Sequence, residues 1–373
     1  MKGHIRKRGN KYVIVVDLER DHNNERRQKW FSGYDTKKAA QKDMPRILNE
    51  INTGNFIEPS KESFAAYLEK WILNKRSRLK ASTFQVYKTH LRIHIIPKLG
   101  NYKLEKLNRL HLKTFFSYLE NDLGLAPATI KKVHTVISSA LSEAVEDGIV
   151  GKNVAAGLKT ARIERKEIHV WDEKQLLQFL NSSKLDPLYI AFHLAAMTGM
   201  RRSEVLGLRW KDVDFENSLL RTVVTHTPYG ASDGKTKASF NRTIDLDGVT
   251  ITELQKRKER VEYEKERAGR AYKDNDLIVC TSLGTHVTPR NLNRKWYQLK
   301  EDANVPSIRF HDLRHTHATL MLLQGIPVKV VAERLGHSSI TTTLDTYNHL
   351  LPSIQREAIA MFSKKLYDSE KKD

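Results

Sequence analysis

The sequence predicts a multidomain protein that is mainly α-helical and carries small β-sheets. At 373 residues the chain is long for one domain and suits two or three. Apolar residues near the N-terminus show the β-branched composition of strands, and from residue 63 onward they follow the period of helices. Short strand-like runs return within a mostly helical C-terminal part. We therefore expect a small sheet-containing unit, a helical domain and a mixed α/β domain, in that order.

Residues 3–34 are expected to form a small three-stranded sheet. The run KYVIVVDLE is rich in β-branched residues, and residues 9–10 and 22–24 supply turns. A helix is expected from Thr36 to about Ile51, ending before Gly54. We assign this unit to residues 1–58.

Four amphipathic helices are expected between residues 63 and 146. Apolar residues recur at helical spacing in the segments 64–72, 84–95, 112–119 and 130–144. Pro97 is expected to end the second helix. Four such stripes predict a compact helical domain over residues 62–158. The stretch GLKTARIERKEIHVW (157–171) lacks an apolar period and is expected to be a linker.

Residues 168–373 are expected to form the mixed domain. Helices are expected around 173–181 and 187–198, strands at 219–225 and 242–246, and mainly helices from about residue 290.

Two apolar patterns lie near the C-terminus. Ile340 and Leu344 share one helical face and are expected to hold their helix to the core, turning Thr343 and Tyr347 toward another face. A later stripe could pack on its own domain or dock on a neighbouring protomer, and the sequence does not decide between the two. That stripe consists of Ile354, Ala358, Met361 and Leu366.

The chain carries a net charge of +20, which favours a polyanionic partner such as nucleic acid. Some basic residues of the N-terminal unit and of the fourth helix are candidates for DNA contact, with a solvated surface as the alternative. They are Arg6, Lys7, Arg8, Arg26, Arg27, Lys131 and Lys132.

Cysteine content and hydropathy restrict the compartment. The single cysteine, Cys280, excludes an intramolecular disulfide and a Cys-cluster zinc site, and suits a reducing cytoplasm. The N-terminus lacks the apolar core of a signal peptide. The longest apolar stretch, PLYIAFHLAAMTGM, is too short to span a bilayer. We therefore expect a cytoplasmic protein without membrane contact.

Three segments of the C-terminal domain contain residues suited to phosphate-ester chemistry. They are TGMRRSEVLGLRW (198–210), HDLRHTHATLMLLQG (311–325) and LGHSSITTTLDTYNH (335–349). Transfer of a phosphate ester without a metal requires a nucleophile, cations for the non-bridging oxygens and an acid for the leaving oxygen. Arg201 lies at a helix junction where anions are favoured, and His311 and Arg314 share one helical face.

Histidine spacing in the second segment also permits a metal site. His311 and His315, or His315 and His317, are separated as zinc or copper ligands can be. Arg314 would repel a cation there and no HExxH pattern is present, so no metal is expected.

In this order and at these spacings, the three segments resemble the signature motifs of tyrosine recombinases, the phage integrase family. The whole layout is similar to integrases of temperate phages and integrative conjugative elements. The resemblance implies an arm-type DNA-binding domain at residues 1–58, a core-binding domain at 62–158 and a tyrosine-recombinase catalytic domain at 168–373.

The resemblance also implies a role for each matching residue. Tyr347 would be the nucleophile that forms a 3′-phosphotyrosyl intermediate, so that the ester keeps the bond energy and no cofactor is needed. Arg201 and Arg314 would clamp the non-bridging oxygens. His311 would be a hydrogen-bonding or proton-transfer group near the nucleophile, and His337 would donate to the phosphate.

Two further positions are carried over in the same way. Glu204 matches an acidic residue that orients the others. Lys235, in DGKTKASFNRTIDL, matches best the lysine that protonates the leaving 5′ oxygen, and Lys237 is the alternative.

The family's reaction implies the partners. They are double-stranded DNA with core-type and arm-type attachment sites, three further copies in a homotetramer on DNA, a host DNA-bending protein and an excisionase. The activity implied is integration and excision of a mobile element or prophage in a bacterial host cell. Relaxation of DNA as by a type IB topoisomerase and a non-catalytic helix-turn-helix regulator are the alternatives. A metal-dependent nuclease is disfavoured because no acidic cluster with metal spacing is present.

Overall fold

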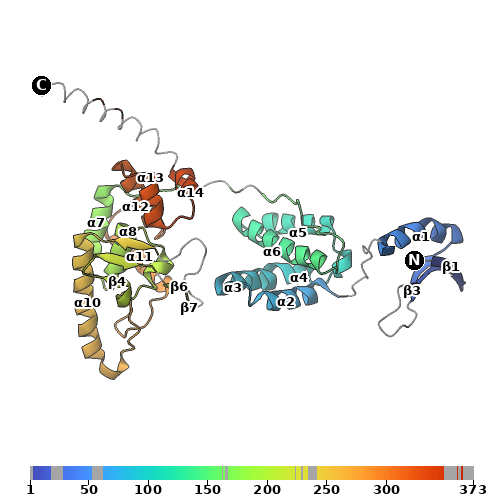
Figure 1. Ribbon diagram of the computed structural model, residues 1–373, viewed down its shortest axis with the longest axis horizontal. Helices are drawn as coiled ribbons and strands as arrows, with labels where there is room; N and C mark the ends of the chain where they lie inside the picture. The colour runs from blue at the N-terminus through green and yellow to red at the C-terminus, as the bar shows by residue number, and fades with distance from the viewer. Residues whose placement is uncertain are drawn as a thin grey trace. The chain divides into compact units, whose positions relative to one another are not determined.

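The computed structural model describes residues 3–17, 28–52, 62–161, 163, 167–222, 224–227, 230–233, 242–347, 359 and 363 (Figure 1). Backbone contacts divide the chain into two units, residues 1–164 and 165–373. Within the described part of the chain, no helix combines the length and the apolar character needed to cross a membrane.

The N-terminal sheet is antiparallel, with the strand order β1-β2-β3. Its strands are β1 (Gly3–Arg8), β2 (Lys11–Asp17) and β3 (Gln28–Tyr34), and helix α1 (Lys37–Asn52) follows. Ile14 and Val16 of β2 pack against Ala40, Ile47 and Ile51 of α1, so that the helix covers one face of the sheet. The expected three-stranded sheet and helix are confirmed.

Four helical segments build the second domain around one apolar core. They are α2 (Phe64–Lys75), α3 (Ala81–His90) continued by a π-helical turn (Leu91–Ile95) and α4 (Ile96–Leu99), α5 (Arg109–Asn121), and α6 (Pro127–Glu146). Ser63 begins α2 as its N-cap by accepting a hydrogen bond from the backbone N–H of Ala66. Pro97 was expected to end the second helix, but the helix does not end there. The proline lies in α4, directly after the π-helical turn, and the helical path continues past it to Leu99.

The C-terminal unit is a mixed domain, as expected. Its helices and strands are α7 (Glu173–Ser183), α8 (Tyr189–Thr198), α9 (Arg202–Val205), β4 (Val213–Asp214), β5 (Leu219–Arg221), β6 (Val224–Thr227), β7 (Gly230–Asp233), β8 (Thr243–Asp245), α10 (Gly248–Ala268), α11 (Pro289–Asp302), α12 (Asp312–Leu323), α13 (Val328–Leu335) and α14 (Ile340–Tyr347). Strands β4, β5 and β8 form one antiparallel sheet, and β6 pairs with β7.

Helix α8 is the centre of this unit. It is buried on nearly every side, and α7, α10 and α12 pack against it. A cluster of rings between Trp171, Phe179, Phe192, Trp296 and Phe310 fills the adjoining core. The end of α8 therefore has a fixed position, and the first of the three motif segments begins there.

Candidate active site

The junction between α8 and α9 is a tight turn at Gly199. Its φ of +65° is left-handed, and an added Cβ would lie 2.6 Å from Leu335 Cδ2 and 2.9 Å from His317 Cδ2. Glycine satisfies both constraints. The turn places Arg201 as the N-cap of α9, beside the helix N-terminus.

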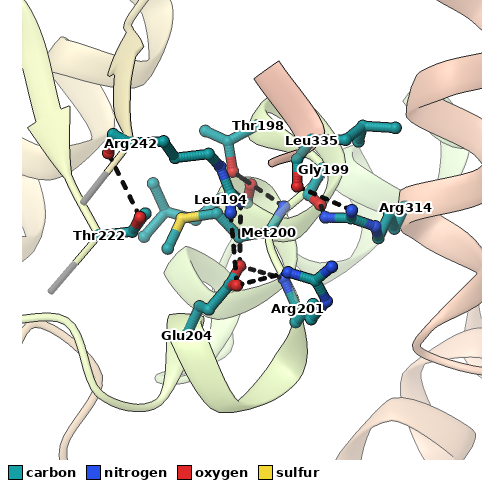
Figure 2. Close-up of polar contacts among 10 residues, drawn as sticks. All are labelled: Leu194, Thr198, Gly199, Met200, Arg201, Glu204, Thr222, Arg242, Arg314 and Leu335. Atoms are coloured by element: carbon teal, nitrogen blue, oxygen red, sulfur yellow. Dashed lines mark hydrogen bonds and ion pairs between the residues drawn. The ribbon is translucent and has the colours of Figure 1, made fainter. Parts of the chain in front are cut away.

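Glu204 is the acidic centre of the site and is only 3% exposed. Its carboxylate accepts hydrogen bonds from the backbone N–H and from Nη1 of Arg201, each at 2.9 Å (Figure 2). It also accepts from Nη1 and Nη2 of Arg242, at 3.3 and 3.0 Å. Burial by itself would raise the pKa of Glu204, but Arg242 and Arg201 outweigh this effect and the pKa is lowered. Glu204 is therefore an anion held between two guanidinium groups.

Arg242 is a buried site residue that the sequence did not single out. It directly precedes β8, and its carbonyl accepts hydrogen bonds from the backbone N–H and the hydroxyl of Thr222 (Figure 2). Its side chain is 8% exposed and extends beneath Gly336, whose added Cβ would lie 2.7 Å from Nη1. An arginine before a short strand gives no signal in the sequence, because solvated arginines are common there.

Arg314 is fixed by two backbone carbonyls. Its Nη1 donates to Gly199 O and its Nη2 to Leu335 O, both at 2.7 Å (Figure 2). Burial, with Arg201 and Arg242 nearby, lowers the pKa of Arg314 to about 9, so the group stays charged at neutral pH. A guanidinium carries five N–H donors, and the carbonyls use two of them. The others remain for a further acceptor.

Together these residues leave an excess of positive charge. Arg201, Arg242 and Arg314 bring three positive charges to the site, and Glu204 supplies one negative charge. Such a partly desolvated excess is stabilised by a bound anion.

His337 directly follows Gly336, the left-handed C-cap of α13. Its Nδ1 is 2.7 Å from the Thr343 hydroxyl, which orients the ring. Burial, followed by the charges of Arg314, Arg201 and Arg242, lowers the pKa of His337 to about 4. The imidazole is therefore neutral at physiological pH, with Nε2 left for another partner.

Tyr347 ends α14 and is 3% exposed. Its hydroxyl lies 2.9 Å from Nδ1 of His315, and its ring packs among apolar residues of α12 and α13. Burial raises the pKa of Tyr347. The expected orientation of α14 is wrong, because Thr343 and Tyr347 face the core while Ile340 and Leu344 are exposed. The pairing of Thr343 with His337 and of Tyr347 with His315 turns this polar face inward.

His311 lies at the exposed edge of the site, just before α12. Its ring meets that of His315 edge-on, with the centroids 5.5 Å apart. Within the part of the chain that the structure describes, the His311 side chain makes no hydrogen bond. Although part of the residue is exposed, desolvation by the surrounding protein, followed by His315 and Arg314, lowers the pKa of His311 to about 4.

The structure thus brings Arg201, Glu204, His311, Arg314, His337 and Tyr347 to one site and adds Arg242 and His315. Lys235 and Lys237 lie outside the described residues. Among the described side chains, no three potential metal ligands gather together. His317, whose spacing suited a metal, instead accepts a hydrogen bond from Arg334 Nε at 3.2 Å.

The family models that match the chain cover all three parts. The phage integrase family matches residues 167–353, the N-terminal SAM-like domain of phage integrases matches 63–119, and an arm DNA-binding domain matches 4–51.

Individual relatives extend over most of the chain. A XerC-like tyrosine recombinase of Caldanaerobacter subterraneus is 30% identical over 374 residues, covering 93% of this chain and 94% of that protein. The Tn1549 transposon integrase in complex with transposon right end DNA has a TM-score of 0.66 at 22% identity, covering 81% of this chain and 99% of that one. A lambda integrase tetramer bound to a Holliday junction has a TM-score of 0.59 at 18% identity, covering 92% and 94%.

A chain with these domains and this site is an enzyme that cleaves DNA and transfers the strands. It belongs to the tyrosine recombinase family, also called the phage integrase family.

Proposed function

We propose that the protein is a site-specific integrase that inserts and excises a mobile element or prophage. The excess positive charge of Arg201, Arg242 and Arg314 around Glu204 is the observation that carries the proposal. A DNA phosphodiester is an anion, and it would bring a negative charge to this site. Tyr347, on the adjoining helix α14, supplies the nucleophile.

In the proposed reaction, the Tyr347 hydroxyl oxygen bonds to the scissile phosphorus and the bond to the 5′ oxygen breaks. Arg201 and Arg314 donate hydrogen bonds to the non-bridging oxygens, where charge builds in the transition state. His337 donates a further bond through Nε2. Lys235, or Lys237, supplies a proton to the leaving 5′ oxygen. The 3′-phosphotyrosyl ester keeps the bond energy, so a 5′ hydroxyl from another duplex can reverse the step without a cofactor.

Binding of DNA is assigned to the basic surfaces. We assign residues 1–58 to arm-type sites, 62–158 to core-type sites and 168–373 to catalysis. Arg6, Lys7 and Arg8 are exposed on β1, and Lys131 and Lys132 are exposed on α6, which supports this division. Arg26 and Arg27, proposed for the same role, lie outside the described residues.

Recombination joins two duplexes through four cleavages, so the working assembly is proposed to be a homotetramer on DNA. The similarity to the lambda integrase tetramer supports this proposal. A host DNA-bending protein and an excisionase are the proposed accessory partners, and the bacterial cytoplasm, where the DNA lies, is the proposed compartment. The apolar stripe proposed for cis or trans docking (354–366) has its members outside the described residues.

A suicide duplex nicked close to the cleavage point tests the proposal. Cleavage releases a short fragment that carries the free 5′ hydroxyl, and loss of this fragment traps the covalent adduct. The full chain should form the adduct, and Tyr347→Phe should bind the duplex without forming it. Tyr263→Phe is the matched control, because Tyr263 is exposed on α10, and it should react normally. An adduct with Tyr347→Phe would refute the assignment. Relaxation of supercoiled DNA without recombinant products would point to a topoisomerase-like activity instead.

A further inference from the structure

The contact between His315 and Tyr347 places a titratable ring against the phenolic hydroxyl. We propose that His315, rather than His311, accepts the phenolic proton of Tyr347 during strand cleavage. The inference rests on the proposed function, because it concerns the tyrosine that this function employs.

Geometry distinguishes the two histidines. His315 Nδ1 lies 2.9 Å from the Tyr347 hydroxyl, within the range of about 2.6–3.2 Å that a general base requires. The centroids of the two rings are 5.9 Å apart, and the two residues belong to α12 and α14. His311 lies one helical turn earlier and contacts the ring of His315 edge-on. The ring of His311 is therefore placed beside that of the proposed proton acceptor.

The charges around His315 leave it able to accept a proton. Burial lowers its pKa, Asp312 opposes this effect, and Arg314 and Arg309 add to it. Among the residues that the structure describes, His311, His337 and Tyr347 also face it. The net lowering keeps the imidazole neutral at physiological pH, so Nδ1 can present a lone pair while Nε2 carries the proton.

The phenol needs such a partner. Burial raises the pKa of Tyr347 and so opposes its ionisation before attack. In the proposed step the proton passes from the hydroxyl to His315 Nδ1 while the phenolic oxygen bonds to phosphorus. The electron pair of the breaking bond goes to the 5′ oxygen, which takes a proton from the general acid. Asp312 favours the resulting imidazolium. Rejoining reverses each transfer, and His315 returns its proton to Tyr347.

His315→Asn is the discriminating variant. The asparagine amide occupies nearly the position of Nδ1 and retains a hydrogen bond to Tyr347, but it does not take up a proton at the pH values used. Single-turnover formation of the covalent adduct is measured on the suicide duplex from pH 5 to 9.5. In the unaltered protein the rate should rise as His315 loses its proton and then level off. The variant should be slower by about 10²–10⁴-fold at pH 7. Its rate should keep rising with pH, because hydroxide must remove the phenolic proton.

Two further measurements separate the possible outcomes. In His315→Ala, added imidazole should restore the rate in proportion to its neutral form, and His311→Ala should show no such rescue. A normal rate and pH profile in His315→Asn, or faster cleavage, would overturn the inference and leave His315 as a contact that only holds the tyrosine at rest. Adduct formation by Tyr347→Phe would instead refute the proposed function. Melting temperature and duplex affinity of each variant show whether it is folded and binds.

Discussion

Replacing Arg242 by alanine removes one of the two guanidinium groups that hold the buried Glu204. The wild-type carboxylate accepts hydrogen bonds from Nη1 and Nη2 of Arg242 and from Nη1 and the backbone N–H of Arg201. The substitution removes the first pair of bonds and also leaves a space beneath Gly336. We expect the C-terminal unit to lose stability and strand cleavage to slow, because Arg201 would then be the one guanidinium among the described residues that orients Glu204.

The size of the effect follows from these contacts. Removing one partner of a buried ion pair costs about 3–5 kcal/mol when the other charge is left alone. Glu204 keeps its two bonds from Arg201, so we expect a smaller loss of about 2–4 kcal/mol in the free energy of unfolding. For a domain of this size each kcal/mol lowers the melting temperature by about 2–4 °C. The expected decrease is therefore about 4–16 °C.

Thermal unfolding followed by circular dichroism measures this decrease. Arg221→Ala is the matched control, because Arg221 is exposed on β5, and it should change stability by no more than about 0.5 kcal/mol.

The stability loss caused by Arg242→Ala should also depend on pH. The folded-state pKa of Glu204 lies below the ordinary 4.5, so its ion pairs stabilise the fold above pH 4.5 and are lost as the pH falls through the folded-state pKa. The difference between Arg242→Ala and the unaltered protein should shrink accordingly. A variant that melts within 1 °C of the unaltered protein at pH 7 would refute this reasoning, as would a difference that persists unchanged in acid.

Three further predictions concern other positions. Gly199→Ala should destabilise the fold by more than the ~1–3 kcal/mol of a strained backbone, because its Cβ would also meet Leu335 and His317. Gly325→Ala, at a φ of +79° with open space, is its matched control in the melting assay, and equal losses would exclude the close contact as the cause. Lys131→Ala and Lys132→Ala should each reduce the salt dependence of DNA binding by about 0.9 in the log–log slope, and an unchanged slope would remove that lysine from the DNA interface. Lys235→Ala should slow cleavage, with recovery on a bridging 5′-phosphorothiolate duplex, and failure to recover would point to Lys237.

Periodicity predicts the elements whose apolar residues form a stripe. The N-terminal sheet and the helices of the second domain follow from composition and spacing. Helix α10 (Gly248–Ala268) was not predicted, because it is rich in charged residues and buries few apolar ones. Its buried face includes Thr250, Glu253 and Arg257, whose Nε donates to Ile278 O. A helix held partly through polar contacts leaves no apolar stripe in the sequence.

The candidate site was predictable only where its residues lie in motifs. Arg201, Glu204, Arg314, His337 and Tyr347 lie together in the structure, although their segments are far apart in the chain. The partners of these residues were not predictable. Arg242 meets Glu204 through the pairing of β5 with β8, and His315 meets Tyr347 through the packing of α12 and α14. Such contacts depend on tertiary structure and leave no spacing to recognise.

Arginine side chains connect the ends of the elements that carry the site. Arg314 joins the carbonyl after α8 to the last carbonyl of α13, through Gly199 and Leu335. Arg334 donates to Met197 O and Asp245 O, which ties α8 to β8. The guanidinium of Arg314, which is proposed to bind phosphate, therefore also determines where the neighbouring segments lie. It follows that the activity lost in Arg314→Ala would combine a missing phosphate contact with a displaced His337. Arg314→Lys would keep the positive charge but not the planar pair of donors that reaches both carbonyls. Of the three arginines around Glu204, only Arg201, which is one-third exposed, would report mainly on phosphate binding when it is replaced.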